Sequence, residues 1–180
     1  YSEVPWRGRI LGNEPQRGDV AVFRPVPQSE NYVKRVIGLP GDRIQVTGGI
    51  LHINGEPVER ELIGQTQDRD SNSTTLPVNV YRETLPNGRS HVIQEISDNA
   101  TFDNTQEYVV PPGHFFMMGD NRDRSLDSRS LPHVGFVPFE NLVGKAEWRF
   151  FSIEDNIPPW QIWRWPGNVR LDRMFTSIYE

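Results

Sequence analysis

The sequence contains no cysteine, which excludes disulfides, thiolate metal sites and a cysteine nucleophile. Long hydrophobic runs are also missing. The longest stretches without a charged residue, Ile44–Gly55 and Tyr108–Gly119, are 12 residues long, whereas a membrane-spanning helix needs roughly 20. We therefore expect the printed sequence not to cross a bilayer. No block of Lys or Arg occurs and the formal net charge is −5, so we expect no binding to nucleic acid.

Metal-binding patterns are equally scarce. The four histidines, at positions 52, 91, 114 and 133, never show the i, i+4 spacing of a zinc helix. The segment Gly119–Arg129 alternates Asn, Asp, Ser and Asp in a way that superficially resembles a calcium loop. However, Leu126 stands where such a loop has Gly, and Pro132 stands where it has a bidentate Glu. We expect no metal and no other cofactor.

Glycine and proline are abundant, with 15 of each among 180 residues. Their spread along the chain favours many short strands joined by turns over long helices. Apolar residues run into Asn54-Gly55, a signal for a type I′ turn, and a second hairpin is predicted at 86–88. β-Branched and aromatic runs predict strands over Asp19–Phe23, Tyr32–Ile37 and Lys145–Phe151. The sequence therefore predicts a mainly β fold.

The middle of the chain differs from its flanks. The segment Arg60–Asn79 is polar and shows no periodicity, which predicts a long exposed loop or an irregular strand region. Most aromatic residues lie in the flanks. This pattern predicts a catalytic β core formed by residues 1–43 and 112–180, with an inserted β-rich subdomain at 44–111.

Lysine is rare in this sequence, because only Lys34 and Lys145 occur among 19 basic residues. Lys34 lies between apolar neighbours inside the segment Tyr32–Asp42 (YVKRVIGLPGD). Arginine stays protonated, whereas a buried lysine can lose its proton. Lys34 is therefore a candidate general base. The alternative interpretation is an edge-strand lysine that prevents aggregation.

The segment Gly119–Arg129 (GDNRDRSLDSR) holds three Asp, three Arg and two Ser, directly after the apolar run Phe115–Met118. One interpretation is a solvated turn with surface ion pairs that contribute little each. The other is a loop that leaves a buried strand and has to satisfy its polar groups internally.

Together with Arg17–Pro25 (RGDVAVFRP), these two segments resemble three motif boxes of bacterial type I signal peptidases, in the same order. These are membrane-anchored serine/lysine endopeptidases that remove signal peptides from exported preproteins. The similarity continues through NTQEYVVPPGHFFMMGD and VGFVPFENLVGKA and covers nearly the whole chain. The polar insert is similar to that of the larger Gram-negative form. The resemblance implies a signal-peptidase-like β core with an inserted antiparallel β subdomain.

The resemblance also implies roles for individual residues. Lys34 would be the general base, and Ser125 would hydrogen-bond its amine and orient it. Tyr32 and Val33 would line the strand against which an extended signal peptide lies, held by backbone hydrogen bonds. The implied reaction is acyl transfer, in which a serine hydroxyl attacks the scissile carbonyl, the lysine takes the proton, and water later hydrolyses the ester.

Two supporting ion pairs are implied around these residues, Asp127 with Arg129 and Asp120 with Arg35. The implied partners are preprotein signal peptides and a membrane surface. The implied location is the inner (cytoplasmic) membrane, with the catalytic domain facing the periplasm.

One box of the family is missing from the sequence. It holds the nucleophilic serine in a Ser-Met-x-Pro pattern, and no serine here matches it; Ser2, for example, is followed by Glu3 and Val4. We expect the nucleophilic serine and the membrane anchor to lie outside the printed sequence. We also expect the printed polypeptide alone not to cleave preproteins.

Other functions stay open at this point. Pilin-processing peptidases and self-cleaving repressors share the serine/lysine chemistry on a related β core, although the complete Gly119–Arg129 box and the large insert favour a preprotein peptidase. A non-catalytic β module that binds extended peptides is a further alternative. That module would have a solvated Lys34 with no contact to Ser125, so the position of these two side chains distinguishes it.

Overall fold

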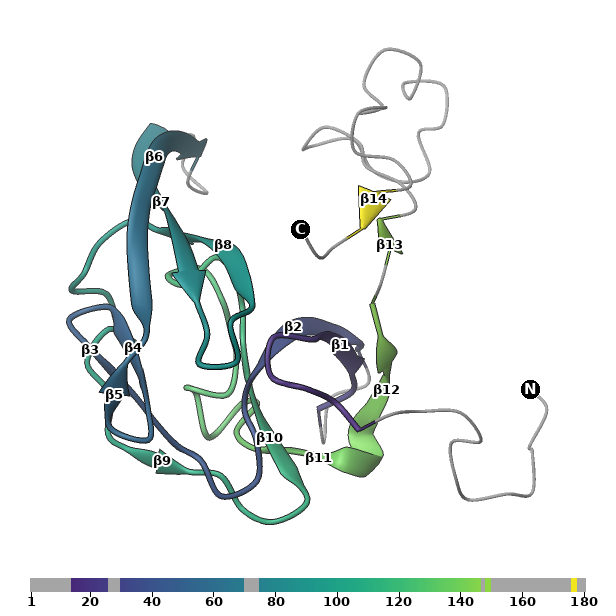
Figure 1. Ribbon diagram of the computed structural model, residues 1–180. Coiled ribbons are helices and arrows are strands. Elements are labelled where there is room, and N and C mark those ends of the chain that lie inside the picture. The colour runs from purple at the N-terminus through teal and green to yellow at the C-terminus, as the bar shows by residue number, and fades with distance from the viewer. Residues whose placement is uncertain (1–13, 26–29, 70–74, 147, 150–175, 178–180) are drawn as a thin grey trace, which may run out of the picture.

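The structure is a computed structural model that describes residues 14–25, 30–69, 75–146, 148–149 and 176–177 (Figure 1). Apart from a 3₁₀ turn at Phe139–Asn141, every regular element in these ranges is a β-strand. The prediction of a mainly β fold is therefore confirmed. Nowhere in these ranges is there a helix with the length and apolarity that crossing a membrane requires.

The strands follow one another at short intervals, as the glycine and proline content predicts. They are β1 (Val20–Phe23), β2 (Tyr32–Gly38), β3 (Arg43–Thr47), β4 (Ile50–Ile53), β5 (Glu56–Pro57), β6 (Glu59–Arg69), β7 (Thr75–Thr84), β8 (Ser90–Glu95), β9 (Tyr108–Val109), β10 (His114–Met118), β11 (Val137–Pro138), β12 (Leu142–Lys145), β13 (Trp148–Arg149) and β14 (Thr176–Ser177).

A five-stranded sheet with the order β11-β10-β2-β1-β12 brings the sequence motifs together. Strand β2 lies at its centre, with β1 on one side and β10 on the other, and both pairings are antiparallel. Ala21 of β1 is opposite Lys34, and Met118, the last residue of β10, is opposite Arg35. The segment that follows β10 therefore starts beside Lys34.

A second sheet, with the order β5-β4-β3-β9, shares a hydrophobic core with the first. Successive side chains of β10 point to opposite faces, so Phe116 and Met118 join this core while Phe115 and Met117 join another. The shared core contains eleven buried residues: Ile37, Ile44, Val46, Leu51, Ile53, Val58, Leu85, Tyr108, Val110, Phe116 and Met118.

The predicted hairpins are present. Asn54 and Gly55 join β4 to β5 with positive φ angles of 58° and 88°, as a type I′ turn requires. The second predicted turn joins β7 to β8, and Gly88 has a φ of 81°.

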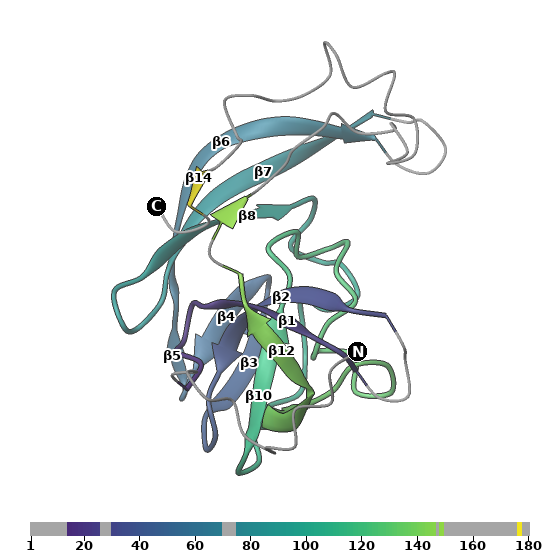
Figure 2. The ribbon, with the colours of Figure 1, turned by 90° about the vertical axis from the view of Figure 1, so that its right-hand side faces the viewer.

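The polar segment Arg60–Asn79 is more regular than expected. Strands β6 and β7 pair in an antiparallel register from Glu59 opposite Thr84 to Arg69 opposite Thr75, with one irregularity between Leu62 and Gly64. They form a long arched ribbon above the other sheets (Figure 2). A ribbon with most of its side chains in solvent needs no apolar alternation, so hydrophobic periodicity did not reveal it.

The strand predicted over Lys145–Phe151 has different bounds. Strand β12 ends at Lys145, where its pairing with Ala21 of β1 ends, and β13 is a separate two-residue strand. Positions 147, 150 and 151 lie outside the described residues.

The proposed division into a core and an insert at 44–111 stays a prediction. The ribbon of β6, β7 and β8 falls wholly inside the insert. The hydrophobic core, however, joins Ile37 and Phe116 to Ile44 and Val46 across the predicted boundary.

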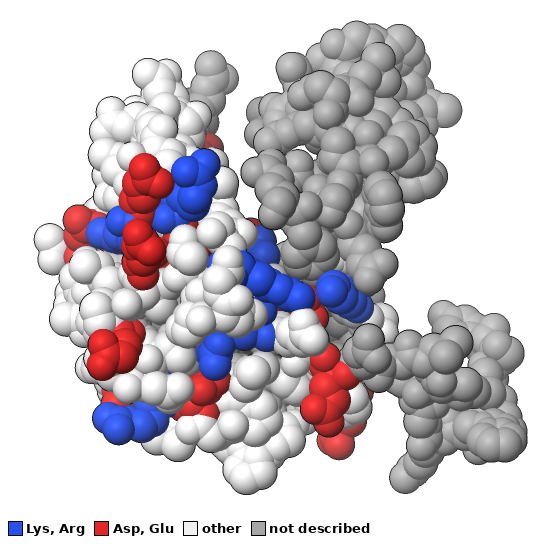
Figure 3. All heavy atoms as spheres, in the orientation of Figure 1, with Lys and Arg blue, Asp and Glu red and all other residues white. Residues whose placement is uncertain are grey.

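The face seen in Figure 3 carries charges of both signs, with Lys and Arg side chains across its middle and Asp and Glu side chains beside them. The protein surface also has exposed ion pairs, such as Arg43 with Glu107 and Arg82 with Glu61. Pairs of this kind contribute little to stability individually.

A substitution at Gly38 tests how tightly the two sheets pack against each other. A methyl group there would lie 2.8 Å from Phe116 Cβ and 2.9 Å from Ile44 Cγ1. We expect Gly38→Ala to lower the free energy of unfolding by about 1–3 kcal/mol, because the packed core cannot absorb the extra carbon. Gly144→Ala is the control, since nothing lies within 4 Å of a methyl group at that strand position. Urea denaturation measures both, and equal stabilities would contradict the described packing.

Candidate active site

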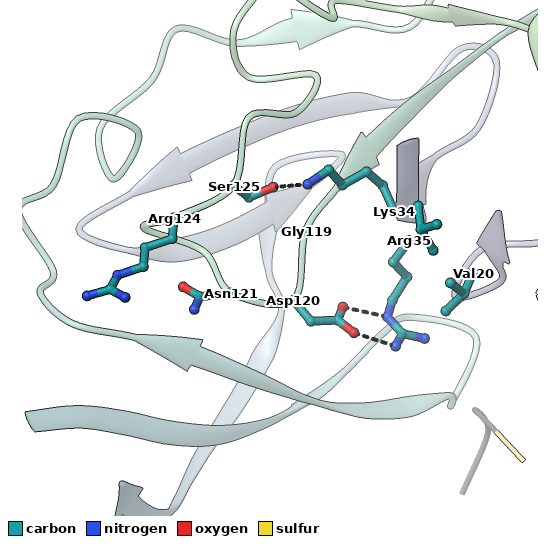
Figure 4. A pocket seen from close by; sticks show the side chains of 9 residues that line it. Val20, Lys34, Arg35, Gly119, Asp120, Asn121, Arg124 and Ser125 are labelled. Atoms are coloured by element: carbon teal, nitrogen blue, oxygen red, sulfur yellow. Dashed lines mark hydrogen bonds and ion pairs between the residues drawn. The ribbon is translucent and has the colours of Figure 1, made fainter. Parts of the chain in front are cut away.

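Lys34 and Ser125 meet in the structure. The Lys34 amine donates a hydrogen bond to Ser125 Oγ at 2.8 Å, across 91 positions of sequence (Figure 4). Gly119 makes this approach possible, because a methyl group there would lie 2.1 Å from Ser125 Oγ and 3.3 Å from Lys34 Nζ. A side chain at position 119 would therefore occupy the space of the contact.

The surroundings of Lys34 favour its neutral form. Burial lowers the pKa of Lys34 below its ordinary value of 10.5, because an ammonium group is disfavoured away from water. The positive charge of Arg129 lowers this pKa further, while the negative charges of Asp127 and Asp120 oppose the shift. An amine that gives up its proton more easily than a solvated lysine suits a general base.

Asp127 and Arg129 form a buried ion pair that closes the loop carrying Ser125. The Arg129 guanidinium donates to both carboxylate oxygens of Asp127 at 2.9 Å, and both side chains are almost fully buried. Burial alone would raise the pKa of Asp127, but the bond with Arg129 lowers it overall. Asp127 also accepts a hydrogen bond from the Gly119 backbone N–H at 3.0 Å. The pair therefore holds both ends of the loop.

Arg35 and Asp120 form the second ion pair around the site, with two bonds of 2.8 Å (Figure 4). Arg35 is 7% exposed and Asp120 is 44% exposed. Arg35 also donates to the Gly18 carbonyl at 2.9 Å. It thus joins β2 to the start of the loop and to the segment that precedes β1.

The sequence analysis did not predict a third ion pair of the site. Arg122 of the loop donates to both carboxylate oxygens of Glu83, at 3.0 and 2.5 Å, and both side chains are buried. Glu83 belongs to β7 and lies in a polar segment where nothing marks it as buried. The sequence offers only a general indication, because each arginine in a charge-dense loop needs an acidic partner. It does not indicate which acidic residue pairs with Arg122.

A cavity of about 270 Å³ opens beside the Lys34 amine. Val33, Asn121 and Arg124 are among the residues that line it. Arg124 also pairs with Asp68 of β6 at 2.6 Å, so the long ribbon reaches the rim of the cavity. Tyr32 does not line the cavity. The centroid of its ring lies 6.0 Å from the centroid of the Phe23 ring.

One edge of β2 is open next to this cavity. Strand β10 pairs with β2 only from Arg35 to Gly38. Among the described residues, no strand pairs with Tyr32–Lys34 on that side, whereas β1 pairs with these residues on the other. Val33 is 55% exposed at this edge. An extended peptide could add to the sheet here through backbone hydrogen bonds.

Ser2, which the sequence analysis considered and set aside as the nucleophile, lies outside the described residues.

Comparison with known proteins gives consistent results. Residues 6–151 match the family described as signal peptidase, peptidase S26. Signal peptidase I of Rickettsia typhi is 38% identical over 193 residues, which cover 97% of this chain and 70% of that protein. Signal peptidase I of Rickettsia canadensis is 39% identical over 194 residues with the same coverage. A crystal structure of a signal peptidase I from Enterococcus faecalis covers 74% of this chain and 97% of its own, with a TM-score of 0.45 and 23% identity.

The stability of the protein at acidic pH tests whether Glu83 anchors the loop. Burial alone would raise the pKa of Glu83, but Arg122 and His91 outweigh it and lower that pKa from 4.5 to about 2. Because the folded pKa lies below the unfolded one, Glu83 stabilises the fold above about pH 4.5, and this contribution is lost as the pH falls towards 2. At about 1.36 kcal/mol per pKa unit, the loss is about 3 kcal/mol.

We expect Glu83→Gln to remove this acid-dependent part, which urea denaturation between pH 6 and pH 2.5 measures. Glu61→Gln is the control, because Glu61 forms an exposed pair with Arg82. If wild type and Glu83→Gln lose stability in parallel as the pH falls, Glu83 is not the anchor.

Proposed function

Because the chain belongs to the signal peptidase family, peptidase S26, it is a serine endopeptidase, and we propose that Lys34 is its general base in removing signal peptides from exported preproteins. One observation carries this assignment: the Lys34 amine lies in a partly buried cavity, 2.8 Å from Ser125 Oγ. The lowered pKa of Lys34 supports it. The non-catalytic alternative required a solvated Lys34 apart from Ser125, and this contact argues against it.

The proposed reaction uses the Lys34 amine for four proton transfers. In its neutral form it takes the proton of the attacking serine hydroxyl as that oxygen bonds to the scissile carbonyl carbon. It then gives the proton to the leaving amine, and the ester remains. In the second half it takes a proton from the water that attacks the ester carbonyl, and it gives this proton to the serine oxygen as the carbon–oxygen bond of the ester breaks. The neutral amine and the serine hydroxyl are thereby restored. The attacking serine is expected outside the printed sequence, because no serine here matches the Ser-Met-x-Pro box.

Ser125 is proposed to orient the amine. Its side-chain hydrogen bond contributes to lowering the pKa of Asp127, so its hydroxyl proton is directed to that carboxylate. Ser125 Oγ then accepts a hydrogen from the Lys34 amine. With one N–H fixed in this way, the lone pair of neutral Lys34 is held in a defined direction. The ion pairs Asp127–Arg129 and Asp120–Arg35 keep the loop in place.

The substrate is proposed to bind as an extended strand along the open edge of Tyr32–Lys34. Backbone hydrogen bonds at such an edge recognise the extended conformation of a peptide, and side-chain pockets add selectivity. The exposed Val33 and the cavity beside Lys34 lie where the scissile bond would be placed.

The location is part of the same proposal. We place the enzyme at the inner membrane with its catalytic part, residues 1–43 and 112–180, facing the periplasm. Family membership supports this location, because signal peptides are processed where preproteins leave the membrane.

Substitutions in the full-length enzyme test the assignment. We expect Lys34→Ala to reduce kcat by about 10²–10⁴-fold, the range for loss of a general base, without a large change in thermal stability. Ser125→Ala should reduce kcat about tenfold, equivalent to one hydrogen bond of about 1.4 kcal/mol. Lys145→Ala is the matched control, since Lys145 pairs with Asp19 and is not among the residues that line the cavity. Preprotein cleavage measures all three, and an active Lys34→Ala enzyme would refute the assignment.

A further inference from the structure

Three acidic side chains from separate segments converge behind the loop that carries Ser125. Glu95 ends β8, Asp103 lies in the connection between β8 and β9, and Asp123 belongs to the loop itself. One carboxylate oxygen of each lies within 4.8 Å of the others. Glu95 and Asp103 are each only 1% exposed. Carboxylates gather in this way only if something offsets their mutual repulsion.

The hydrogen bonding of these carboxylates provides a separate observation. Asp103 Oδ2 accepts from the Ala100 backbone N–H at 2.5 Å, but the buried Asp103 Oδ1 has no hydrogen-bond partner in the described part of the chain. Asp123 is bonded in the same way. Its Oδ2 accepts hydrogen bonds from the backbone N–H groups of Ile96 and Ser97, and its buried Oδ1 has no hydrogen-bond partner among the described residues. Buried acceptors are almost always satisfied, so these two oxygens point to a missing ligand.

The neighbouring arginines compensate only part of this negative charge. Arg60 pairs with Glu95 and also with Asp98. Arg122 is committed to Glu83, and Arg129 to Asp127. Among the described residues, neither Asp103 nor Asp123 has an ion-pair partner.

Burial and nearby acidic residues raise the pKa values of two carboxylic acids of the cluster. Burial, followed by the negative charges of Asp103 and Asp98, raises the pKa of Glu95 to about 7, although Arg60 opposes the shift. Burial, with the charges of Asp123 and Asp98, also raises the pKa of Asp103. Burial is the first cause of both shifts.

We propose that Glu95, Asp103 and Asp123 bind a Ca²⁺ ion. Calcium prefers oxygen ligands at 2.3–2.6 Å, so two oxygens that share one ion can be up to about 5 Å apart, whereas magnesium at 2.0–2.1 Å needs a tighter group. The separations in this cluster are all within 4.8 Å and therefore inside the limit for calcium. The expectation of no metal rested on histidine spacing and on the calcium-loop pattern within 119–132, and neither tests ligands from three segments.

The ion would connect the insert to the catalytic loop. Asp123 precedes Ser125 by two positions, and Glu95 and Asp103 belong to the predicted insert. An ion that binds only the folded state stabilises that state by mass action. Calcium therefore fixes the loop through Asp123, independently of the chemistry that Lys34 performs.

Calorimetric titration of CaCl₂ into chelator-treated, full-length protein tests this site directly. We expect one ion per chain with a Kd of about 10⁻³ M or below, the range of extracellular calcium modules, and a rise in Tm with added CaCl₂. Asp103→Asn and Asp123→Asn should each weaken binding at least about tenfold. Glu61→Gln is the control, because Glu61 is exposed and pairs with Arg82 rather than with a member of the cluster, and this variant should bind calcium like wild type.

The titration of the wild-type protein decides the proposal even if a variant does not fold. No heat of binding and no change in Tm up to about 10 mM CaCl₂, well above that range, would mean that a water or a shared proton satisfies the two oxygens, and would overturn the proposal. Equal affinity in wild type and Asp103→Asn would place the ion elsewhere and overturn it too. MgCl₂ that binds as tightly as CaCl₂ would overturn the assignment to calcium.

Discussion

The buried ion pair between Asp127 and Arg129 closes the loop that follows β10, and the site depends on that closure. The loop leaves a fully buried strand while carrying six charges, so its polar groups have to find partners inside the protein. Asp127 holds the Gly119 backbone at one end and Arg129 at the other. Ser125 lies between these points, which places its hydroxyl against the Lys34 amine. The ion pair that closes the loop therefore also holds Ser125 in hydrogen-bond contact with Lys34.

Two layers of contacts around this loop have different roles. Arg35 and Asp120 tie its beginning to β2, the strand that presents Lys34. Arg122 and Glu83 tie its middle to β7 of the long ribbon. Breaking a buried pair by removing one partner is costly, because the remaining charge stays buried. The long ribbon therefore contacts the loop through Glu83, and the calcium site proposed at Asp123 would act on the same loop.

Residue types alone left two interpretations open for Lys34 and two for the charge-dense segment that follows β10, and the resemblance to signal peptidases implied the roles of both. The pair Asn54-Gly55 was enough to predict a hairpin. Glu83 could not be predicted, because its burial follows from how the ribbon lies against the loop and not from its neighbours in sequence. The regular pairing of β6 with β7 was hidden for a related reason: strands exposed to water carry no apolar alternation. The cluster of Glu95, Asp103 and Asp123 depends on three segments meeting in space.

The central claim is that the pocket favours the neutral amine of Lys34, and NMR can measure this without any substrate. The sequence holds only two lysines, so Lys145→Arg leaves Lys34 as the single signal in protein labelled at lysine side chains. The account predicts that this signal titrates with a midpoint below the ordinary lysine pKa of 10.5. A midpoint at or above 10.5 would show that the pocket stabilises the ammonium form, and it would contradict the role of Lys34 as general base.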